Sequence, residues 1–145
     1  MTRSLSKPLL NYSISMKSSY NDGEWTRQQF VRWVIGFIRR AFVKWEPRRK
    51  ALKEASVGRK TNKKTGRLAE HFICSDCGKD FVQRDVQVDH IEPVVDPKEG
   101  FVDLEHYFDR MFCDTDNLQI LCRECHKGKT KEENRKRKEV RDGRK

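Results

Sequence analysis

Long hydrophobic runs are missing from this sequence of 145 residues. No apolar stretch approaches the roughly 20 residues of a membrane-spanning helix, so we expect no membrane partner. Hydrophobic residues are also scarce, at 35% against 37% charged residues. A chain this polar fits one domain with an extension, but it cannot build a large core of its own. Something besides apolar burial is therefore expected to stabilise the fold.

A secretory signal is also missing from the beginning of the sequence. Residues 1–22 are rich in Ser and show no apolar periodicity. Transit peptides have a loosely similar composition, but we interpret the segment as a disordered leader. Five cysteines in a chain without an export signal indicate a reducing compartment, the cytoplasm, where paired cysteines bind metal more often than they form disulfides.

The net charge of +10 is unevenly distributed along the chain. Residues 1–68 carry a net charge of +13, residues 69–125 carry −9, and residues 126–145 carry +6. Basic flanks favour a polyanionic partner, whereas an acidic middle repels phosphates unless metal cations neutralise it. A metal-dependent enzyme acting on nucleic acid accounts for both signs, and a passive nucleic-acid binder accounts for the flanks alone.

Helical periodicity is clearest in the first half of the chain. Apolar residues recur at helical spacing over residues 24–44, which predicts a helix capped by Asp22 or Thr26. Pro47 either ends this helix or begins a second one that runs to Ala55. We expect the Trp-rich face to pack on the core, and the arginines beside it either face solvent or contact DNA.

A basic segment follows at residues 57–67, with turn-forming residues and no apolar periodicity. This composition predicts a loop that grips phosphates. Its candidate DNA-binding residues are Arg59, Lys60, Lys63 and Lys64.

The second half alternates short strands with helices. Residues 86–90 alternate as in a half-buried strand, and residues 96–113 contain the spacing of a short inserted helix. His106 in that insertion is expected to be an exposed helix residue. We expect a turn and a second short strand at residues 117–121. Good helix formers follow, which predict a terminal helix from 122 to 138.

Two cysteine pairs give the most specific signal in the sequence. Cys74 and Cys77, and again Cys122 and Cys125, are separated by two residues, so each pair can reach one tetrahedral ion. Together they predict a four-cysteine structural zinc site, against the alternative of four reduced buried thiols. The 44 residues between the pairs exceed the usual zinc-ribbon spacing, so the ion must hold a larger motif together. Cys113 has no matching partner and is expected to be a small buried hydrophobe.

Further motifs lie between and after the cysteine pairs. They are Asp89-His90-Ile91-x-Pro93, Asn117, and Cys125-His126-x-x-Lys129-Thr130. Together they resemble the HNH endonucleases of the zinc-stabilised type common in phage genomes, over roughly residues 68–137. The resemblance implies an α+β fold with a ββα-metal core. It divides the chain into the leader at 1–22, a basic helical extension at 23–67, a nuclease domain at 68–138 and a basic tail at 139–145.

The resemblance also implies roles for individual residues. His90 matches the general base, since imidazole exchanges protons near neutral pH. Asp89 and His126 match the ligands of a catalytic divalent cation, which could be Mg²⁺, Mn²⁺ or another transition ion. Asn117 matches a residue that either orients the base or joins the metal shell. Lys129 matches a phosphate contact.

Two functional hypotheses follow. The first is a metal-dependent DNA endonuclease or nickase, encoded by a phage or mobile element and active in the host cytoplasm. The second is a non-catalytic zinc module that binds DNA or assists packaging, for which phage packaging proteins are the expected partners. Retention of all four presumed catalytic residues favours the enzyme. No feature of the sequence indicates an oligomeric state.

Overall fold

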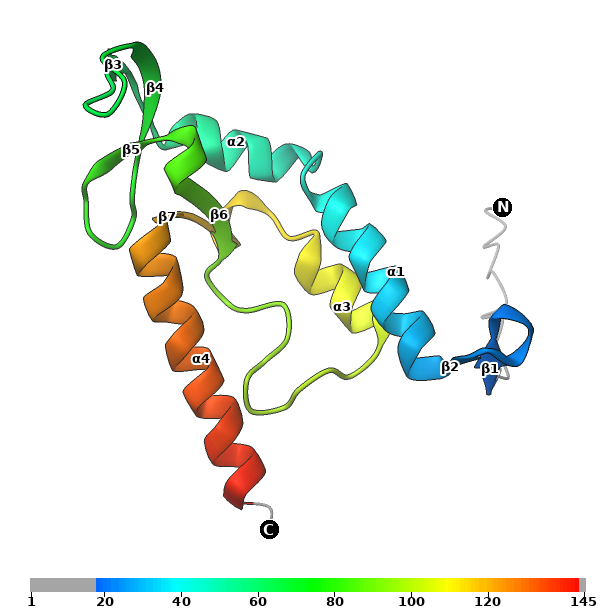
Figure 1. Ribbon diagram of the computed structural model, residues 1–145. Helices are drawn as coiled ribbons and strands as arrows, with labels where there is room; N and C mark the ends of the chain where they lie inside the picture. Colours follow the sequence, from blue (N-terminus) through cyan, green and yellow to red (C-terminus); the bar gives the residue numbers. More distant parts are fainter. Residues whose placement is uncertain (1–17, 144–145) are drawn as a thin grey trace, which may run out of the picture. The chain divides into compact units, whose positions relative to one another are not determined.

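The computed structural model describes residues 18–143, so most of the expected leader lies outside the described residues. The described part is a mixed α+β protein with four α-helices and small antiparallel sheets (Figure 1). It forms two compact units, one ending at Val34 and the other beginning at Ile35. None of the helices among residues 18–143 combines the length and the apolar composition that a membrane span needs.

The first unit contains a short two-stranded ribbon. Its elements are β1 (Ser19–Tyr20), a 3₁₀ turn (Asn21–Gly23), β2 (Trp25–Thr26) and the beginning of α1 (Arg27–Phe42). Aromatic rings hold the ribbon against α1, because Tyr20 stacks on Phe30 at 3.9 Å and Trp25 meets Trp33 edge-on at 5.9 Å. The end of the expected leader thus forms strand β1.

Thr26 caps helix α1. Its hydroxyl accepts a hydrogen bond from the Gln29 backbone N–H at 3.3 Å, and Gln29 Oε1 accepts one from the Thr26 N–H at 2.8 Å. This reciprocal pair is a capping box, which satisfies two N–H groups at the helix end. The second of the two expected caps is therefore confirmed, and α1 begins at Arg27 because β2 occupies the two residues before it.

The second unit contains the rest of α1, all later α-helices and strands, and two 3₁₀ turns at Gln83–Asp85 and Thr115–Asn117. These later helices and strands are α2 (Glu46–Glu54), β3 (Ser56–Thr61), β4 (Leu68–Ile73), β5 (Asp80–Val82), β6 (Val86–His90), α3 (Leu104–Met111), β7 (Leu118–Cys122) and α4 (Arg123–Gly143). This unit therefore includes residues 35–67, which the sequence assigns to a helical extension. The short strands, the inserted helix and the terminal helix expected beyond residue 86 are confirmed.

The basic segment at 57–67 is only partly a loop: residues 62–67 form the predicted turn, but residues 57–61 belong to strand β3, which the prediction missed. β3 and β4 pair as an antiparallel hairpin, and β4 also pairs with β5. The turn closes where the Gly66 N–H donates to the Asn62 carbonyl at 2.8 Å, with Gly66 in the left-handed region at φ 69°. Periodicity missed β3 because nearly all its side chains are exposed, so backbone pairing rather than burial defines the strand.

The core of the second unit lies between the β6–β7 pair and α2. Phe72, Val86 and Ile120 form its centre, and Leu52 and Ala55 of α2 pack against them. A backbone hydrogen bond from Ile73 N to Ala55 O, at 2.9 Å, ties β4 to the end of α2. Pro47 stands in the first turn of α2 and therefore begins that helix, as one of the two interpretations predicted.

The aromatic residues predicted to form one face of the first helix belong partly to the first unit and partly to the second. Trp33 packs with Trp25 inside the first unit and remains 50% exposed. In the second unit, Phe42 is buried, and Trp45 packs on Phe112 and donates a hydrogen bond to the Cys113 carbonyl at 2.8 Å. The prediction that the tryptophans pack on the core is thus confirmed for Trp45 and wrong for Trp33.

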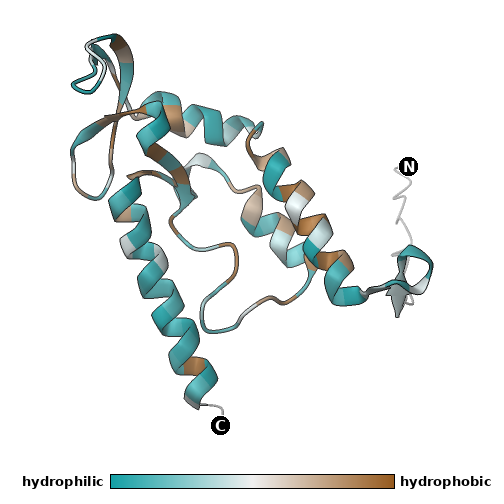
Figure 2. Ribbon diagram, in the orientation of Figure 1, coloured by the Kyte–Doolittle hydropathy of each residue, from teal (hydrophilic) through white to brown (hydrophobic). Residues whose placement is uncertain are grey.

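Helix α4 leads directly out of β7 (Figure 1) and is hydrophilic over almost its whole length (Figure 2). It has no buried residue. Pairs such as Arg135 with Glu132 and Glu139 link successive turns along its exposed side. What α4 contributes to the molecule is therefore a row of polar side chains rather than core volume.

Candidate metal and catalytic site

The four paired cysteines come together in space. The Sγ atoms of Cys74, Cys77, Cys122 and Cys125 all lie within 4.8 Å of one another. Four thiolates bound to one zinc at about 2.3 Å are separated by about 3.8 Å, so this cluster fits a structural zinc ion. The described residues contain no second group of three or more Cys, His, Asp or Glu side chains gathered in this way.

Backbone hydrogen bonds build the cluster from two distant segments. The turn after β4 is closed by the Gly78 N–H donating to the Cys74 carbonyl at 2.9 Å, with Gly78 at φ 68°. Ser75 N donates to Ile120 O at 2.8 Å, which joins this turn to β7. Since Cys122 ends β7 and Cys125 lies in the first turn of α4, the cluster fixes where α4 begins.

The surroundings of Cys74 lower the pKa of its thiol. Burial opposes its ionisation, but N–H groups of Cys77, Cys122 and Asp76 hydrogen-bond to the sulfur and together lower the pKa of Cys74 to about 7. Zinc binds the thiolate rather than the thiol, so the low pKa of Cys74 favours metal binding at this sulfur. Hydrogen bonds to Asp76 and Cys122 instead raise the pKa of Cys125, which keeps its proton until a metal displaces it. Cys113, by contrast, is half-buried away from the cluster, and burial raises the pKa of its thiol.

Asp89 and His126 face each other beside the cluster. Asp89 Oδ1 lies 3.7 Å from His126 Nε2, and the two side chains are 17% and 31% exposed. Two ligands bound to one cation at about 2.1 Å lie between about 3 Å and 4.2 Å apart. The pair therefore has a separation and a donor chemistry that fit one divalent cation.

The other oxygen of Asp89 belongs to a polar network. Oδ2 accepts from Gln119 Nε2 at 3.1 Å and lies 3.0 Å from Lys129 Nζ, which also contacts Glu133 at 2.6 Å. Burial alone would lower the pKa of Lys129, but the hydrogen bonds to Glu133 and Asp89 outweigh it and raise that pKa. Lys129 is thus a fixed positive charge that holds Asp89 in place.

His90 is buried at the end of β6, next in sequence to Asp89. Its Nε2 lies 3.0 Å from the Met111 carbonyl oxygen, and its ring lies 4.8 Å from the Phe42 ring. A carbonyl can only accept, so Nε2 carries the hydrogen in this bond and Nδ1 of the neutral ring keeps its lone pair. In its neutral form, His90 therefore presents the lone pair of Nδ1 as an acceptor.

One open pocket of about 720 Å³ brings these groups together. Its lining includes Asp89, His90, His126 and Lys129, which are four of the residues predicted from sequence. Thr130, Glu133 and Arg137 continue this lining along the same face of α4, at the spacing of successive helical turns.

Asn117, the fifth residue predicted for the catalytic site, does not line this pocket. Its Oδ1 accepts from the Glu92 N–H at 2.9 Å, and its backbone carbonyl accepts from the Ile91 N–H at 2.9 Å. Both bonds hold the two residues that directly follow His90. In this structure Asn117 therefore braces the backbone next to His90 and hydrogen-bonds neither to the imidazole nor to Asp89.

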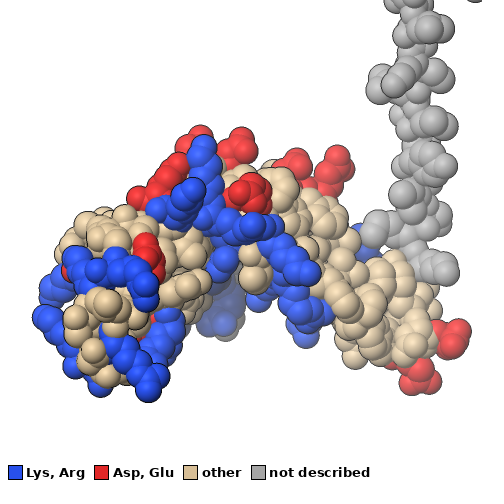
Figure 3. Space-filling model, turned by 90° about the horizontal axis from the view of Figure 1, so that it is seen from above, with Lys and Arg blue, Asp and Glu red and all other residues tan. Residues whose placement is uncertain are grey.

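The predicted DNA-binding cations of the 57–67 segment also lie outside the pocket lining, on the β3–β4 hairpin and its turn. Lys60 lies 3.4 Å from Asp80 and Lys64 lies 3.8 Å from Asp85, whereas no carboxylate of the described residues pairs with Arg59 or Lys63. Basic side chains surround the hairpin, at the left of Figure 3. The hairpin thus carries a positive surface of its own.

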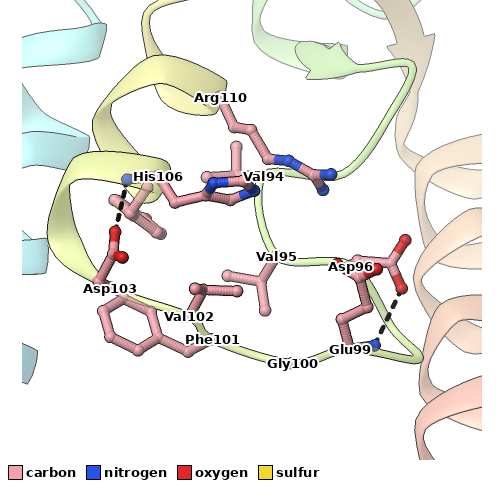
Figure 4. A pocket seen from close by; sticks show the side chains of 11 residues that line it. Val94, Val95, Asp96, Glu99, Gly100, Phe101, Val102, Asp103, His106 and Arg110 are labelled. Carbon is pink, nitrogen blue, oxygen red and sulfur yellow. Dashed lines mark hydrogen bonds between the residues drawn. The ribbon is translucent and has the colours of Figure 1, made fainter.

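Another, much smaller pocket is lined by α3 and the segment between β6 and α3 (Figure 4). Asp103 caps α3 by accepting from the His106 N–H at 2.7 Å, and Asp96 accepts from the N–H groups of Lys98 and Glu99. The volume of this pocket is about 10 Å³, which holds no more than one water molecule. His106 is exposed, as expected, and this segment shows no ligand site.

Several pocket residues were not anticipated from the sequence. Glu133 and Arg137 follow His126 at helical spacing, a signal that could have identified them. Arg48 and Tyr107 come from distant elements, and no local pattern points to them. In comparisons with known proteins, no family model matches the chain, and neither a curated protein nor a solved structure matches it.

Proposed function

We propose that this protein is a metal-dependent nuclease that hydrolyses phosphodiester bonds in DNA, with the HNH type of site. One observation carries the proposal. His90, with Nδ1 free to accept a proton, lines the same pocket as the Asp89–His126 pair, whose facing atoms are 3.7 Å apart. A proton acceptor beside a cation site is the minimum that hydrolysis of a phosphodiester requires.

In the proposed reaction, a water molecule attacks phosphorus and transfers its proton to Nδ1 of His90. The bond from phosphorus to the 3′ oxygen breaks, and the leaving oxygen takes a proton from a solvent water, which yields a 5′-phosphate and a 3′-hydroxyl. The Met111 carbonyl accepts the hydrogen bond from Nε2 and so stabilises the imidazolium that forms. Asn117 fixes the backbone after His90 and thereby keeps the ring in its position.

Asp89 and His126 would hold the catalytic cation, which can be Mg²⁺, Mn²⁺ or another divalent transition ion. When bound, this cation supplies positive charge beside the phosphate oxygens and the leaving oxygen. Lys129 supplies a second positive charge 3.0 Å from Asp89. Only two protein ligands contact the cation in this proposal, which leaves positions for water and phosphate oxygens.

The finer fold in this proposal is a ββα-metal core made of β6, β7 and the first turns of α4. Zinc at the four cysteines would supply no chemistry. It would instead hold β7 and α4 at the angle that brings His126 to within 3.7 Å of Asp89. The net charge of +10 and the basic β3–β4 hairpin support DNA as the substrate.

Supercoiled plasmid provides the test. The purified, zinc-loaded protein is incubated with plasmid, without added metal and with Mg²⁺, Mn²⁺, Co²⁺ or Ni²⁺ in turn. We expect relaxed or linear DNA only where metal is added, with ends that a ligase can rejoin because they carry a 5′-phosphate and a 3′-hydroxyl. Protein that binds the plasmid but leaves it supercoiled in every metal would contradict the proposal and favour a non-catalytic DNA-binding module.

A further inference from the structure

Two walls of the large pocket differ in how their cations are neutralised. On α4, Lys129 contacts both Asp89 and Glu133, and Arg137 lies 3.9 Å from Glu133. The wall built by α1 and α2 contributes two more cations and no acid. The two α4 cations that line the pocket, Lys129 and Arg137, are therefore neutralised by nearby acids, and the cations of the second wall are not.

Arg48 of α2 is the clearest unbalanced charge. It is half-buried, yet no carboxylate of the described residues lies within 4.0 Å of its guanidinium. Its Nη1 donates only to the Val43 carbonyl at 3.4 Å, and its Cζ lies 5.9 Å from the centre of the Phe42 ring. Burial lowers the pKa of Arg48, so removing this charge from water is costly and no acidic neighbour offsets it.

Phe42 connects this arginine to the candidate base. The same Phe42 ring lies 4.8 Å from the His90 imidazole, with the two ring planes inclined at 30°. Arg48 and His90 therefore share one buried aromatic neighbour and line one pocket. The guanidinium is held near the base by packing rather than by an ion pair.

Arg39 of α1 is the second cation on this wall. Its Nε donates to the hydroxyl of Tyr107, a residue that is 3% exposed, at 3.2 Å. A bond at Nε leaves the two terminal nitrogens of the guanidinium available. Like Arg48, Arg39 has no carboxylate partner among the described residues, so two oriented guanidinium groups line the pocket with free donors.

We propose that Arg48 and Arg39 form a phosphate-binding wall, which holds a backbone phosphate of a nucleic-acid strand next to the phosphodiester that reaches His90. The planar fork of a guanidinium matches two phosphate oxygens, so each arginine can bind one phosphate in bidentate fashion. A pocket of about 720 Å³ is larger than a single phosphate needs and is open to solvent, as a polymer strand requires. The position of the strand relative to His90 rests on the proposed nuclease function, whereas binding at the wall does not.

The chain offers a matched control for this test. Arg49 is the next residue of α2, but it is 64% exposed and lies 3.5 Å from Glu46. Arg48→Gln and Arg49→Gln remove the same charge from adjacent positions, so long-range attraction of DNA changes equally in both. A difference between them measures the contact that Arg48 makes in the pocket.

Binding is measured with the full chain and a fluorescein-labelled single-stranded oligonucleotide, by anisotropy, in buffer without added divalent cation. We expect Arg48→Gln to weaken binding about tenfold or more, as when a charge-assisted bidentate contact is lost. Arg49→Gln should stay within about twofold of wild type. Equal effects of the two substitutions would overturn the proposal.

Arg48→Lys keeps the positive charge and part of the aliphatic side chain that lies over Phe42. This variant replaces Arg48→Gln in the binding test if Arg48→Gln loses zinc or does not unfold cooperatively. We expect this variant to weaken binding several-fold because ammonium lacks the fork. Wild-type affinity in Arg48→Lys would overturn the bidentate contact.

The cleavage and binding measurements distinguish a failure of the nuclease proposal from a failure of the phosphate-binding wall. If wild type cleaves no DNA in any metal but Arg48→Gln still loses affinity relative to Arg49→Gln, the nuclease proposal fails and the phosphate-binding wall stands. If wild type cleaves and the two variants bind and cleave alike, the wall fails and the nuclease proposal stands.

Discussion

Loss of the zinc site should unfold the second unit, and the size of the effect follows from how little else stabilises it. Of the described residues, 13 hydrophobic side chains are buried, and two of these are the cluster cysteines Cys74 and Cys122. Structural zinc contributes about 10–16 kcal/mol of apparent folding free energy in small domains. A typical domain has a total stability of about 5–15 kcal/mol, so we expect none to remain without the ion.

The perturbation is Cys74→Ser, with Cys113→Ser as the matched control. Cys74 is 1% exposed inside the cluster, whereas Cys113 is half-buried outside it and uses its carbonyl, not its thiol, to accept from Trp45. We expect about one zinc per chain in wild type and in Cys113→Ser, and much less in Cys74→Ser. Cys113→Ser should change stability by about 1 kcal/mol or less.

The assay combines metal analysis with thermal unfolding followed by circular dichroism. A strong chelator should abolish the cooperative transition of wild type, and added zinc should restore it. A cooperative transition in protein shown to contain no zinc would refute the reasoning, as would equal destabilisation by the two serine substitutions.

Three further predictions concern other parts of the structure. Replacing Arg59 and Lys63 of the hairpin by Gln should reduce the slope of log affinity against log salt by about 1 per lost phosphate contact, and an unchanged slope in DNA-binding titrations would show that these cations only face solvent. Asn117→Ala removes the brace on Glu92 and should slow plasmid cleavage about tenfold or more without changing the metal concentration that half-saturates the rate; a shifted metal requirement would instead indicate a role as ligand. Trp45→Phe deletes the hydrogen bond to the Cys113 carbonyl and should cost about 1 kcal/mol in urea unfolding, so an unchanged midpoint would contradict it.

Local signals in the sequence predicted much of this fold. Two residues between paired cysteines constrain both thiols to one ion, and the four sulfurs are indeed together. The strand at 86–90 and the helix at the end of the chain were predictable because burial and helix propensity act over neighbouring residues. Strand β3 was not, since its side chains are nearly all exposed and leave no alternating pattern of burial.

The candidate site was predictable only where one motif supplies the residues. Asp89, His90 and His126 stand in motifs, and the structure brings all three to one pocket. The role of Asn117 depends on which backbone atoms lie opposite its amide, and only the folded chain reveals Glu92 there. Arg48 comes from an element 42 residues before His90, so its place in the pocket follows from packing on Phe42 rather than from any spacing.

The most direct test of the nuclease proposal compares the proposed base with a proposed metal ligand. His90→Asn replaces the imidazole by an amide that cannot act as a base, and His126→Ala removes one side of the cation site. Plasmid cleavage by both variants is measured across Mn²⁺ concentrations, with zinc content and DNA affinity checked in parallel. We expect cleavage by His90→Asn to fall by about 10² or more at every Mn²⁺ concentration, and cleavage by His126→Ala to recover partly at high Mn²⁺. Cleavage at the wild-type rate by folded, zinc-loaded His90→Asn would contradict the account.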